Sequence, residues 1–130
     1  MKLSKSQRQQ LHDKYGGKCA YCGCDLPNKW HADHIEPIYR NTLVYDRKNN
    51  VLVDATKHHL DVIENLNPAC PACNNYKHTL TLEKFRIELS KQVERAMNSC
   101  NFRLALKYKQ IIINQSPIVF YFEKMQNECT

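Results

Sequence analysis

Four cysteines, arranged as two Cys-x2-Cys pairs, are the residues of this sequence best suited to chemistry. Cys19 and Cys22 form the first pair, Cys70 and Cys73 form the second, and residues 23–69 separate them. Four thiolates at about 2.3 Å complete the tetrahedral shell of a Zn²⁺ ion and leave no open position. The spacing therefore predicts a structural zinc site that links two distant segments. Four buried free cysteines acting as small hydrophobic side chains are the alternative.

The other cysteines, Cys24, Cys100 and Cys129, have no partner at ligand spacing. The sequence has no apolar run of the roughly 18 residues that span a bilayer, and residues 1–6 are polar and charged without the apolar segment of a signal peptide. We therefore expect a cytoplasmic protein with no membrane partner. In that compartment thiols are metal ligands or free groups more often than disulfides.

The composition fits one soluble domain. The chain has 130 residues, of which 42% are hydrophobic and 25% are charged, and this length is too short for a multidomain protein. Lys and Arg number 19 against 13 for Asp and Glu, which gives a formal net charge of +6. An excess of positive charge is compatible with a polyanionic partner such as nucleic acid, although charge alone is weak evidence.

Local signals predict the elements that must position the cysteines. Ser4 and Gln7 form a capping-box pattern, which predicts a short helix that ends near Gly16. Residues 19–23 then form a tight metal-binding turn, in which small residues let backbone amides approach the sulfur atoms. Apolar residues favour an extended strand over residues 30–39, whose successive side chains face opposite sides.

Two helices are expected between residues 71 and 97. Pro71 suits the first position of a helix, because its missing N–H group costs nothing there. On that helix Asn74 and His78 lie four residues apart and share one face. Apolar residues at intervals of three or four predict an amphipathic helix over residues 82–97, directly behind Thr81.

Shorter patterns cover the remaining segments. Residues 40–60 are mostly polar and are expected to form a long, partly ordered connection, in which only 43–45 and 51–53 favour short strands. A second helical patch covers residues 102–108. The composition of residues 118–122, which are β-branched and aromatic, predicts a strand.

Taken in order, these pieces resemble the HNH nuclease family in its four-cysteine form. The matching pattern is a cysteine pair, an Asp-His-Ile-x-Pro strand, an Asn-Leu, and a second cysteine pair followed by Asn and then Lys. It covers about residues 15–80, and the tail is loosely similar to C-terminal extensions of small bacterial and phage HNH proteins. The resemblance implies an α+β fold, with a treble-clef-like ββα-metal core, a four-cysteine zinc site and flanking helices. Residues 1–130 would form one domain, with a helical extension over about 81–130.

The resemblance also implies an activity, the hydrolysis of DNA phosphodiesters with one Mg²⁺ or Mn²⁺ ion. His34 would be the general base, because imidazole titrates near neutral pH and can accept a proton from water. Asp33 and Asn74 would bind the metal through oxygen atoms. His78 is a third candidate ligand, because nuclease colicins carry His-x3-His at this place. Asn65 matches the middle Asn of the family, which orients the base and its loop.

Candidate DNA-contacting residues are basic. Arg40, Arg47, Lys48 and Lys57 lie in the central connection and could bind phosphates without reading sequence. Lys77 would lie near the scissile phosphate or beside the cysteine turn. The alternatives are a solvated loop whose charges confer solubility and an ordinary exposed helical lysine. Since no recognition helix is visible, we expect weak sequence preference.

Three functions are compatible with these residues. The first is a metal-dependent endonuclease that acts on double-stranded DNA, of the kind found in phages, mobile elements and anti-phage defence systems. The second is a zinc-stabilised nucleic-acid-binding module, which would have no need for Asp33, His34 and Asn74 together. The third is a nuclease subunit that is inactive until a partner such as an ATPase positions it, with residues 82–97 as a docking face. Because one active site cuts one strand, a double-strand break needs a homodimer or two visits.

Overall fold

The computed structural model describes residues 1–38, 43–54 and 58–128. Its helices are α1 (Lys5–Asp13), α2 (Pro71–Lys77), α3 (Leu82–Ser90), α4 (Gln92–Ala96), α5 (Cys100–Lys107) and α6 (Tyr121–Glu128). Its strands are β1 (His31–His34), β2 (Leu43–Asp46), β3 (Val51–Asp54) and β4 (Leu66–Ala69), and two 3-10 turns, η1 (His58–Leu60) and η2 (Ile63–Asn65), precede β4. The predicted α+β class is confirmed. None of the helices in these ranges has the length and apolar character needed to cross a membrane.

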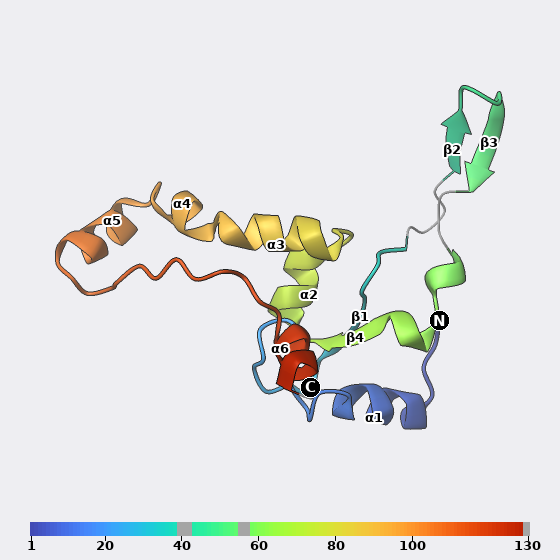
Figure 1. Cartoon of the computed structure of the whole chain (residues 1–130), viewed down its shortest axis with the longest axis horizontal. Coiled ribbons are helices and arrows are strands. Elements are labelled where there is room, and N and C mark those ends of the chain that lie inside the picture. Colours follow the sequence, from blue (N-terminus) through green and yellow to red (C-terminus); the bar gives the residue numbers. More distant parts are fainter. Residues whose placement is uncertain (39–42, 55–57, 129–130) are drawn as a thin grey trace.

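A two-stranded antiparallel sheet and the helix that follows it form the centre of the molecule (Figure 1). His31 on β1 lies opposite Ala69 on β4, and His34 lies opposite Leu66. Every residue of β4 is buried, and Cys70 alone separates this strand from α2. Because the connection is so short, α2 begins at the end of the sheet and packs against β1.

Helix α1 begins with the predicted capping box. The Gln7 backbone N–H donates to Ser4 Oγ at 3.1 Å, and the Ser4 backbone N–H donates to the Gln7 side chain at 3.0 Å. The helix ends at Asp13, earlier than predicted, and it buries Leu11 in a small cluster with Trp30. This cluster attaches α1 to the central sheet.

An aromatic cluster joins the turn of the first cysteine pair to the C-terminal segment. The Tyr21 ring stands edge-on to Phe85 and Phe120, with ring centroids 5.6 and 5.4 Å apart. Phe85 and Phe120 stack on each other at 5.4 Å. The Tyr121 N–H donates to the Tyr21 carbonyl at 3.1 Å, so backbone and side chains together hold the C-terminal segment on this turn.

The strand predicted over residues 118–122 is wrong, because α6 begins within this segment, at Tyr121. Glu123 stabilises the start of the helix. Its side chain accepts from the Phe120 N–H at 2.9 Å and pairs with Arg86 at 2.9 Å. The phenylalanines of the segment are buried in the aromatic cluster, so its apolar character reflects packing and not strand pairing.

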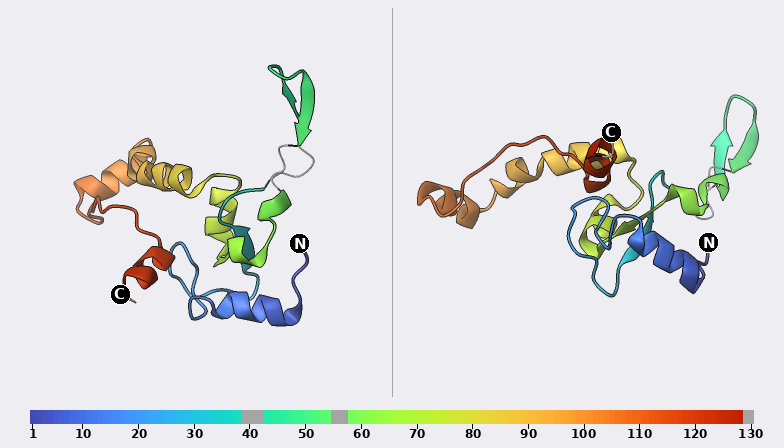
Figure 2. Two further views of the ribbon diagram at one scale, coloured as in Figure 1. Left: turned by 45° about the vertical axis from the view of Figure 1, so that its right-hand side comes forward. Right: turned by 60° about the horizontal axis from the view of Figure 1, so that its bottom comes forward.

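Other boundaries also differ from the predictions. The helix predicted over residues 82–97 is interrupted at Lys91, which joins α3 to α4. The strand predicted over residues 30–39 ends at His34, because its partner strand begins only at Leu66. The second helical patch is confirmed as α5, and the two short central strands are confirmed as the hairpin β2–β3. Figures 1 and 2 show that this hairpin stands away from the rest of the molecule.

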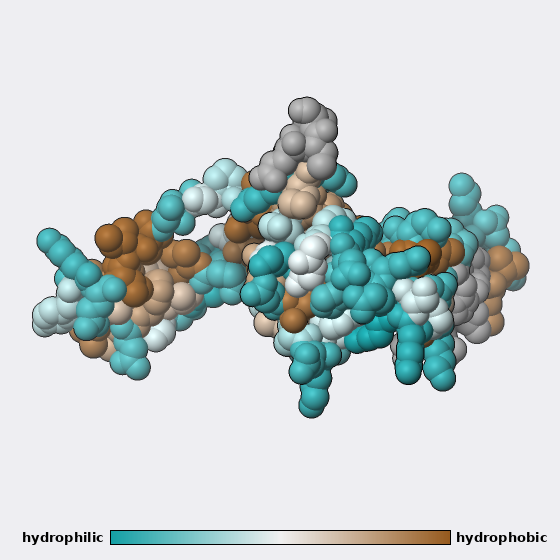
Figure 3. Space-filling model, turned by 90° about the horizontal axis from the view of Figure 1, so that it is seen from below, coloured by the Kyte–Doolittle hydropathy of each residue, from teal (hydrophilic) through white to brown (hydrophobic). Residues whose placement is uncertain are grey.

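Helices α3, α4 and α5 form an arm that leads away from the centre, and the chain returns beside it to α6 (Figures 1 and 2). No residue in the described stretch 91–119 is buried. Figure 3 shows apolar surface at the far end of this arm. Leu104 on α5 and Ile112 shortly after it are exposed. This stretch therefore has no core of its own, and the role of residues 82–97 as a docking face stays a prediction.

Candidate functional site

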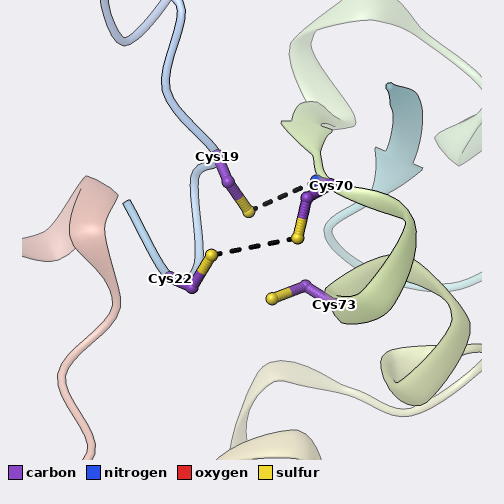
Figure 4. Close-up of side chains that lie close together, drawn as sticks. All are labelled: Cys19, Cys22, Cys70 and Cys73. Carbon is purple, nitrogen blue, oxygen red and sulfur yellow. Dashed lines mark hydrogen bonds between the residues drawn. The ribbon is translucent and has the colours of Figure 1, made fainter. Parts of the chain in front are cut away.

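The side chains of the two cysteine pairs converge beside the start of α2 (Figure 4). The sulfur atoms of Cys19, Cys22, Cys70 and Cys73 all lie within 4.8 Å of one another. The Cys22 and Cys70 sulfur atoms are 3.8 Å apart. A tetrahedron with metal–sulfur bonds of about 2.3 Å has edges of about 3.8 Å. The four cysteines can therefore hold a metal ion such as zinc, as the spacing predicts.

Two local features place these sulfur atoms. Gly23 has a φ of 78°, and its N–H donates to the Cys19 carbonyl at 3.0 Å, which closes the first turn. Cys70 is the N-cap residue of α2 and Pro71 is the first helical residue, as predicted. Cys73 consequently lies in the first turn of the helix, where the helix dipole favours a thiolate.

Among the four clustered cysteines, Cys19 has the thiol that loses its proton most readily. A hydrogen bond with the Cys73 thiol, together with backbone N–H groups, lowers the pKa of Cys19 to about 4 against the opposing effect of burial. The hydrogen bond to the Cys19 thiolate in turn raises the pKa of Cys73. A metal ion binds thiolates, so it would displace the proton that Cys19 and Cys73 share. All four sulfur atoms would then be ionised.

A polar pocket of about 350 Å³ lies between β1 and α2. Four of the residues predicted to act on DNA line it, namely Asp33, His34, Asn74 and His78. The fold thus brings together side chains from two segments that are far apart in the sequence. Asn65 is not among the residues that line this pocket.

Asp33 lies at the buried edge of the pocket, with 5% of its surface exposed. One carboxylate oxygen accepts a hydrogen bond from the Tyr21 hydroxyl and lies 3.1 Å from Lys77 Nζ. Burial raises the pKa of Asp33, and the positive charge of Lys77 acts in the opposite direction. The carboxyl group of Asp33 is therefore held in place by groups of the protein itself.

Lys77 is fully buried, which contradicts a DNA contact and an exposed helical lysine. Its Nζ lies 6.0 Å from the centroid of the Tyr21 ring, beside the turn of the first cysteine pair, which is the other predicted position. Its ammonium group donates to the His34 carbonyl at 2.7 Å and pairs with Asp33. A charged group in the interior needs such partners, because burial removes it from water. Lys77 therefore holds α2 against β1 and lies where a DNA phosphate cannot reach it.

His34 has a direct partner that the sequence analysis missed. Its Nε2 lies 2.9 Å from Asp61 Oδ1, and the other Asp61 oxygen lies 2.8 Å from the amino group of Met1. Hydrogen bonds from Met1 and, second, from His34 lower the pKa of Asp61. No motif or periodicity marks Asp61, so nothing in the sequence pointed to this contact.

Asn65 connects the loop after β1 with the segment before β4. Its side-chain oxygen accepts from the Glu36 N–H at 3.0 Å, and its side-chain nitrogen donates to the carbonyls of Glu36 at 2.9 Å and Leu60 at 3.0 Å. The Asn65 carbonyl also accepts from the Ile35 N–H at 2.8 Å. Asn65 thus holds the loop beside His34, and it does so through contacts with the backbone.

Asn74 and His78 reach the pocket from the two ends of one helical turn. The predicted helix stops at Lys77, and His78 follows with a φ of 47° and a ψ of −117°. The His78 N–H donates to the Asn74 carbonyl at 2.9 Å. Among the described residues, the cysteines are the only group of three or more His, Cys, Asp or Glu side chains close enough to share an ion. The pocket therefore offers a sparse set of donors.

Two of the predicted DNA contacts lie on the hairpin β2–β3. Arg47 and Lys48 are exposed in the turn between its strands. Tyr45 and Leu52, which pair across the strands, are also exposed, at 52% and 66%. The predicted contacts Arg40 and Lys57 lie outside the described residues.

Removal of one cluster cysteine should release the metal and destabilise the fold. Cys73→Ser is expected to lower the zinc content well below about one ion per chain and to cost several kcal/mol of unfolding free energy, because a structural zinc site contributes to folding directly. Cys100→Ser is the matched control, since Cys100 is exposed at the start of α5 and is not one of the four clustered cysteines. Metal analysis and denaturant unfolding check both variants. An unchanged zinc content in Cys73→Ser would contradict the cluster.

Replacement of the buried lysine should destabilise the centre of the molecule. Lys77→Met leaves the Asp33 carboxylate buried without its cation, and we expect a loss of about 3 kcal/mol in denaturant unfolding. Lys84→Met removes an exposed lysine and should change stability by less than about 0.5 kcal/mol. The double variant Asp33→Asn/Lys77→Met should recover part of the loss, because no unpaired charge remains. Purely additive losses would argue against the ion pair.

Comparison with known proteins leaves the family open. No protein-family model matches the chain, and neither the curated proteins nor the solved structures give a significant match. The resemblance to HNH nucleases therefore rests on the motif residues, and the function must be argued from the cysteine cluster and the pocket beside it.

Proposed function

We propose that the protein is a metal-dependent DNA endonuclease whose active site is the pocket between β1 and α2. One observation carries the proposal. Asp33 and His34 from β1 and Asn74 and His78 from the α2 region line the same pocket, although they were selected from the sequence alone. In the proposed enzyme the cysteine cluster holds a structural Zn²⁺ ion, and the pocket carries out the chemistry.

The donor groups in the pocket fit a hard divalent ion such as Mg²⁺ or Mn²⁺. The Asp33 carboxylate, the Asn74 amide oxygen and the His78 imidazole would hold it. Few protein ligands are sufficient, because Mg²⁺ keeps several waters and binds substrate phosphates. When bound, the ion neutralises the charge that develops at the scissile phosphate and the leaving oxygen. Lys77 supports this role, because its positive charge favours the ionised form of Asp33 and opposes the burial that raises the pKa of this carboxyl.

His34 is the group best placed to activate water. Its side chain is 26% exposed and lines the pocket. In the proposed step the imidazole accepts a proton from water, the water oxygen bonds to phosphorus, and the bond from phosphorus to the leaving oxygen breaks. The leaving oxygen then takes a proton from solvent. General-base catalysis of this kind contributes about 10² to 10⁴ in rate.

The charge of the chain supports double-stranded DNA as the substrate. The formal net charge of +6 favours a polyanion, and Arg47 and Lys48 form a basic end on the hairpin β2–β3. Contacts of this type bind phosphates with little regard to sequence. We include in the proposal a cytoplasmic role in a phage, a mobile element or anti-phage defence. A partner such as an ATPase would position the nuclease, and a homodimer would allow both strands to be cut.

One observation favours a second candidate function, nucleic-acid binding without catalysis. Asp33 has Lys77 and Tyr21 as partners inside the protein, which accounts for its presence without a metal. A binding module would not need His34, Asn74 and His78 to line the same pocket. We therefore prefer the endonuclease.

Loss of His34 should abolish cleavage. Purified protein is expected to nick supercoiled plasmid with Mg²⁺ or Mn²⁺ and to stop when a chelator is added. His34→Ala should reduce the rate at least about 100-fold. His31→Ala is the control, because His31 is exposed on the same strand and does not line the pocket. Circular dichroism verifies the folding of each variant. DNA binding without any cleavage by the wild type would favour the binding module instead.

Replacement of His78 by glycine should raise the stability of the protein and lower its nuclease activity. The φ of 47° and ψ of −117° at His78 suit glycine, so His78→Gly should raise the unfolding free energy by about 1 kcal/mol. The same variant should slow metal-dependent nicking, because it removes a proposed ligand. Lys109→Gly is the matched control, since Lys109 also has a positive φ, 59°, but lies on the arm. It should gain stability with unchanged nicking, and equal activities of the two variants would contradict the role of His78.

A further inference from the structure

His34 stands between two pockets. It lines the proposed active site, and it also lines a second pocket of about 390 Å³ that contains Asp61. The Nε2 atom of the ring is 2.9 Å from Asp61 Oδ1, and the two side chains are 26% and 21% exposed. One nitrogen of the imidazole is therefore already engaged on the side of the second pocket.

The backbones on both sides of this contact are fixed. Lys77 Nζ donates to the His34 carbonyl at 2.7 Å, which holds the end of β1. Asn65 donates to the carbonyl of Leu60, the residue directly before Asp61, at 3.0 Å. The Asn65 carbonyl accepts from the N–H of Ile35, the residue directly after His34. The pair is consequently supported from both chain segments, unlike two flexible side chains that meet at a surface.

The chemistry of the two groups determines where the proton lies. An ionised carboxylate only accepts hydrogen bonds, and the pKa of Asp61 lies below its ordinary value because Met1 and His34 donate to it. In a neutral His34 ring, the contact therefore requires the hydrogen on Nε2. The lone pair then remains on Nδ1, which is the form an imidazole needs to accept a proton from water.

We propose that Asp61 is a positioning residue, which holds the His34 ring in the tautomer and orientation that leave Nδ1 free to act as the base. This inference rests on the proposed nuclease function. When Nδ1 takes the proton from water, the imidazolium carries a positive charge beside the Asp61 carboxylate. Asp61 thus both orients the ring and stabilises the charge that forms on it during the reaction.

The tautomer can be measured without any cleavage assay. Long-range ¹H–¹⁵N correlation spectra of the zinc-loaded protein, at about pH 8 where an ordinary imidazole is neutral, should place the His34 hydrogen on Nε2. Asp61→Ala should shift the ring to a mixture of tautomers. Glu64→Gln is the matched control, because it removes one negative charge from an exposed side chain on the adjacent turn, and it should leave the spectrum unchanged. A wild-type hydrogen on Nδ1, or an unchanged spectrum in Asp61→Ala, would overturn the proposal.

Kinetics test the catalytic consequence. Asp61→Asn should lower kcat about 10- to 100-fold with little change in KM, and Asp61→Glu should restore part of the rate, whereas Glu64→Gln should match the wild type. An Asp61→Asn enzyme with full kcat would overturn the positioning role. If the wild type itself cuts no DNA while the tautomer still depends on Asp61, the nuclease function fails, and the contact is then a structural one only. The two failures are therefore distinguishable.

Discussion

The buried ion pair between Lys77 and Asp33 is the interaction on which the rest of the site depends. It joins the last residue of α2 to the middle of the short strand β1, and both charges lie in the interior. Burial of two charges costs several kcal/mol for each ion, which only close pairing and further hydrogen bonds repay. The Tyr21 hydroxyl and the His34 carbonyl supply those bonds. A shift of β1 or α2 would leave a buried charge unpaired. The ion pair therefore fixes the position of α2 relative to β1, and these two elements line the pocket.

The cysteine cluster fixes the same helix at its other end. Helix α2 has 7 residues and is therefore about 10 Å long, with Cys70 and Cys73 at its start and His78 just beyond its end. Tyr21 connects the two regions, because it lies within the first cysteine pair, packs in the aromatic cluster and bonds to Asp33. A metal on the cysteines would thus stabilise the position of the pocket residues without taking part in their chemistry.

The sequence predicted those features of the site and fold that depend on interactions between residues close together in the chain. The Cys-x2-Cys spacing, the proline that starts α2 and the capping box each act within a few residues, and all three are confirmed. Burial of Lys77 could not be read in this way, because lysines are mostly exposed and its partner lies on another strand. The contact of Asp61 with His34 likewise joins distant segments. Residues 118–122 were mistaken for a strand because a short apolar run fits a strand and a buried segment equally well.

The position of the pocket at the end of β1 explains how neighbouring side chains can share one site. Successive residues of a strand face opposite sides, so Asp33 and His34 would be separated on a long strand. Here β1 ends at His34, and the loop that follows contributes Pro37 and Ile38 to the same pocket. Asp33 can then lie on the buried side with Lys77, while the His34 ring remains partly exposed. The early end of the strand therefore gives each of the two residues its own environment within one pocket, as the proposed metal ligand and the proposed base require.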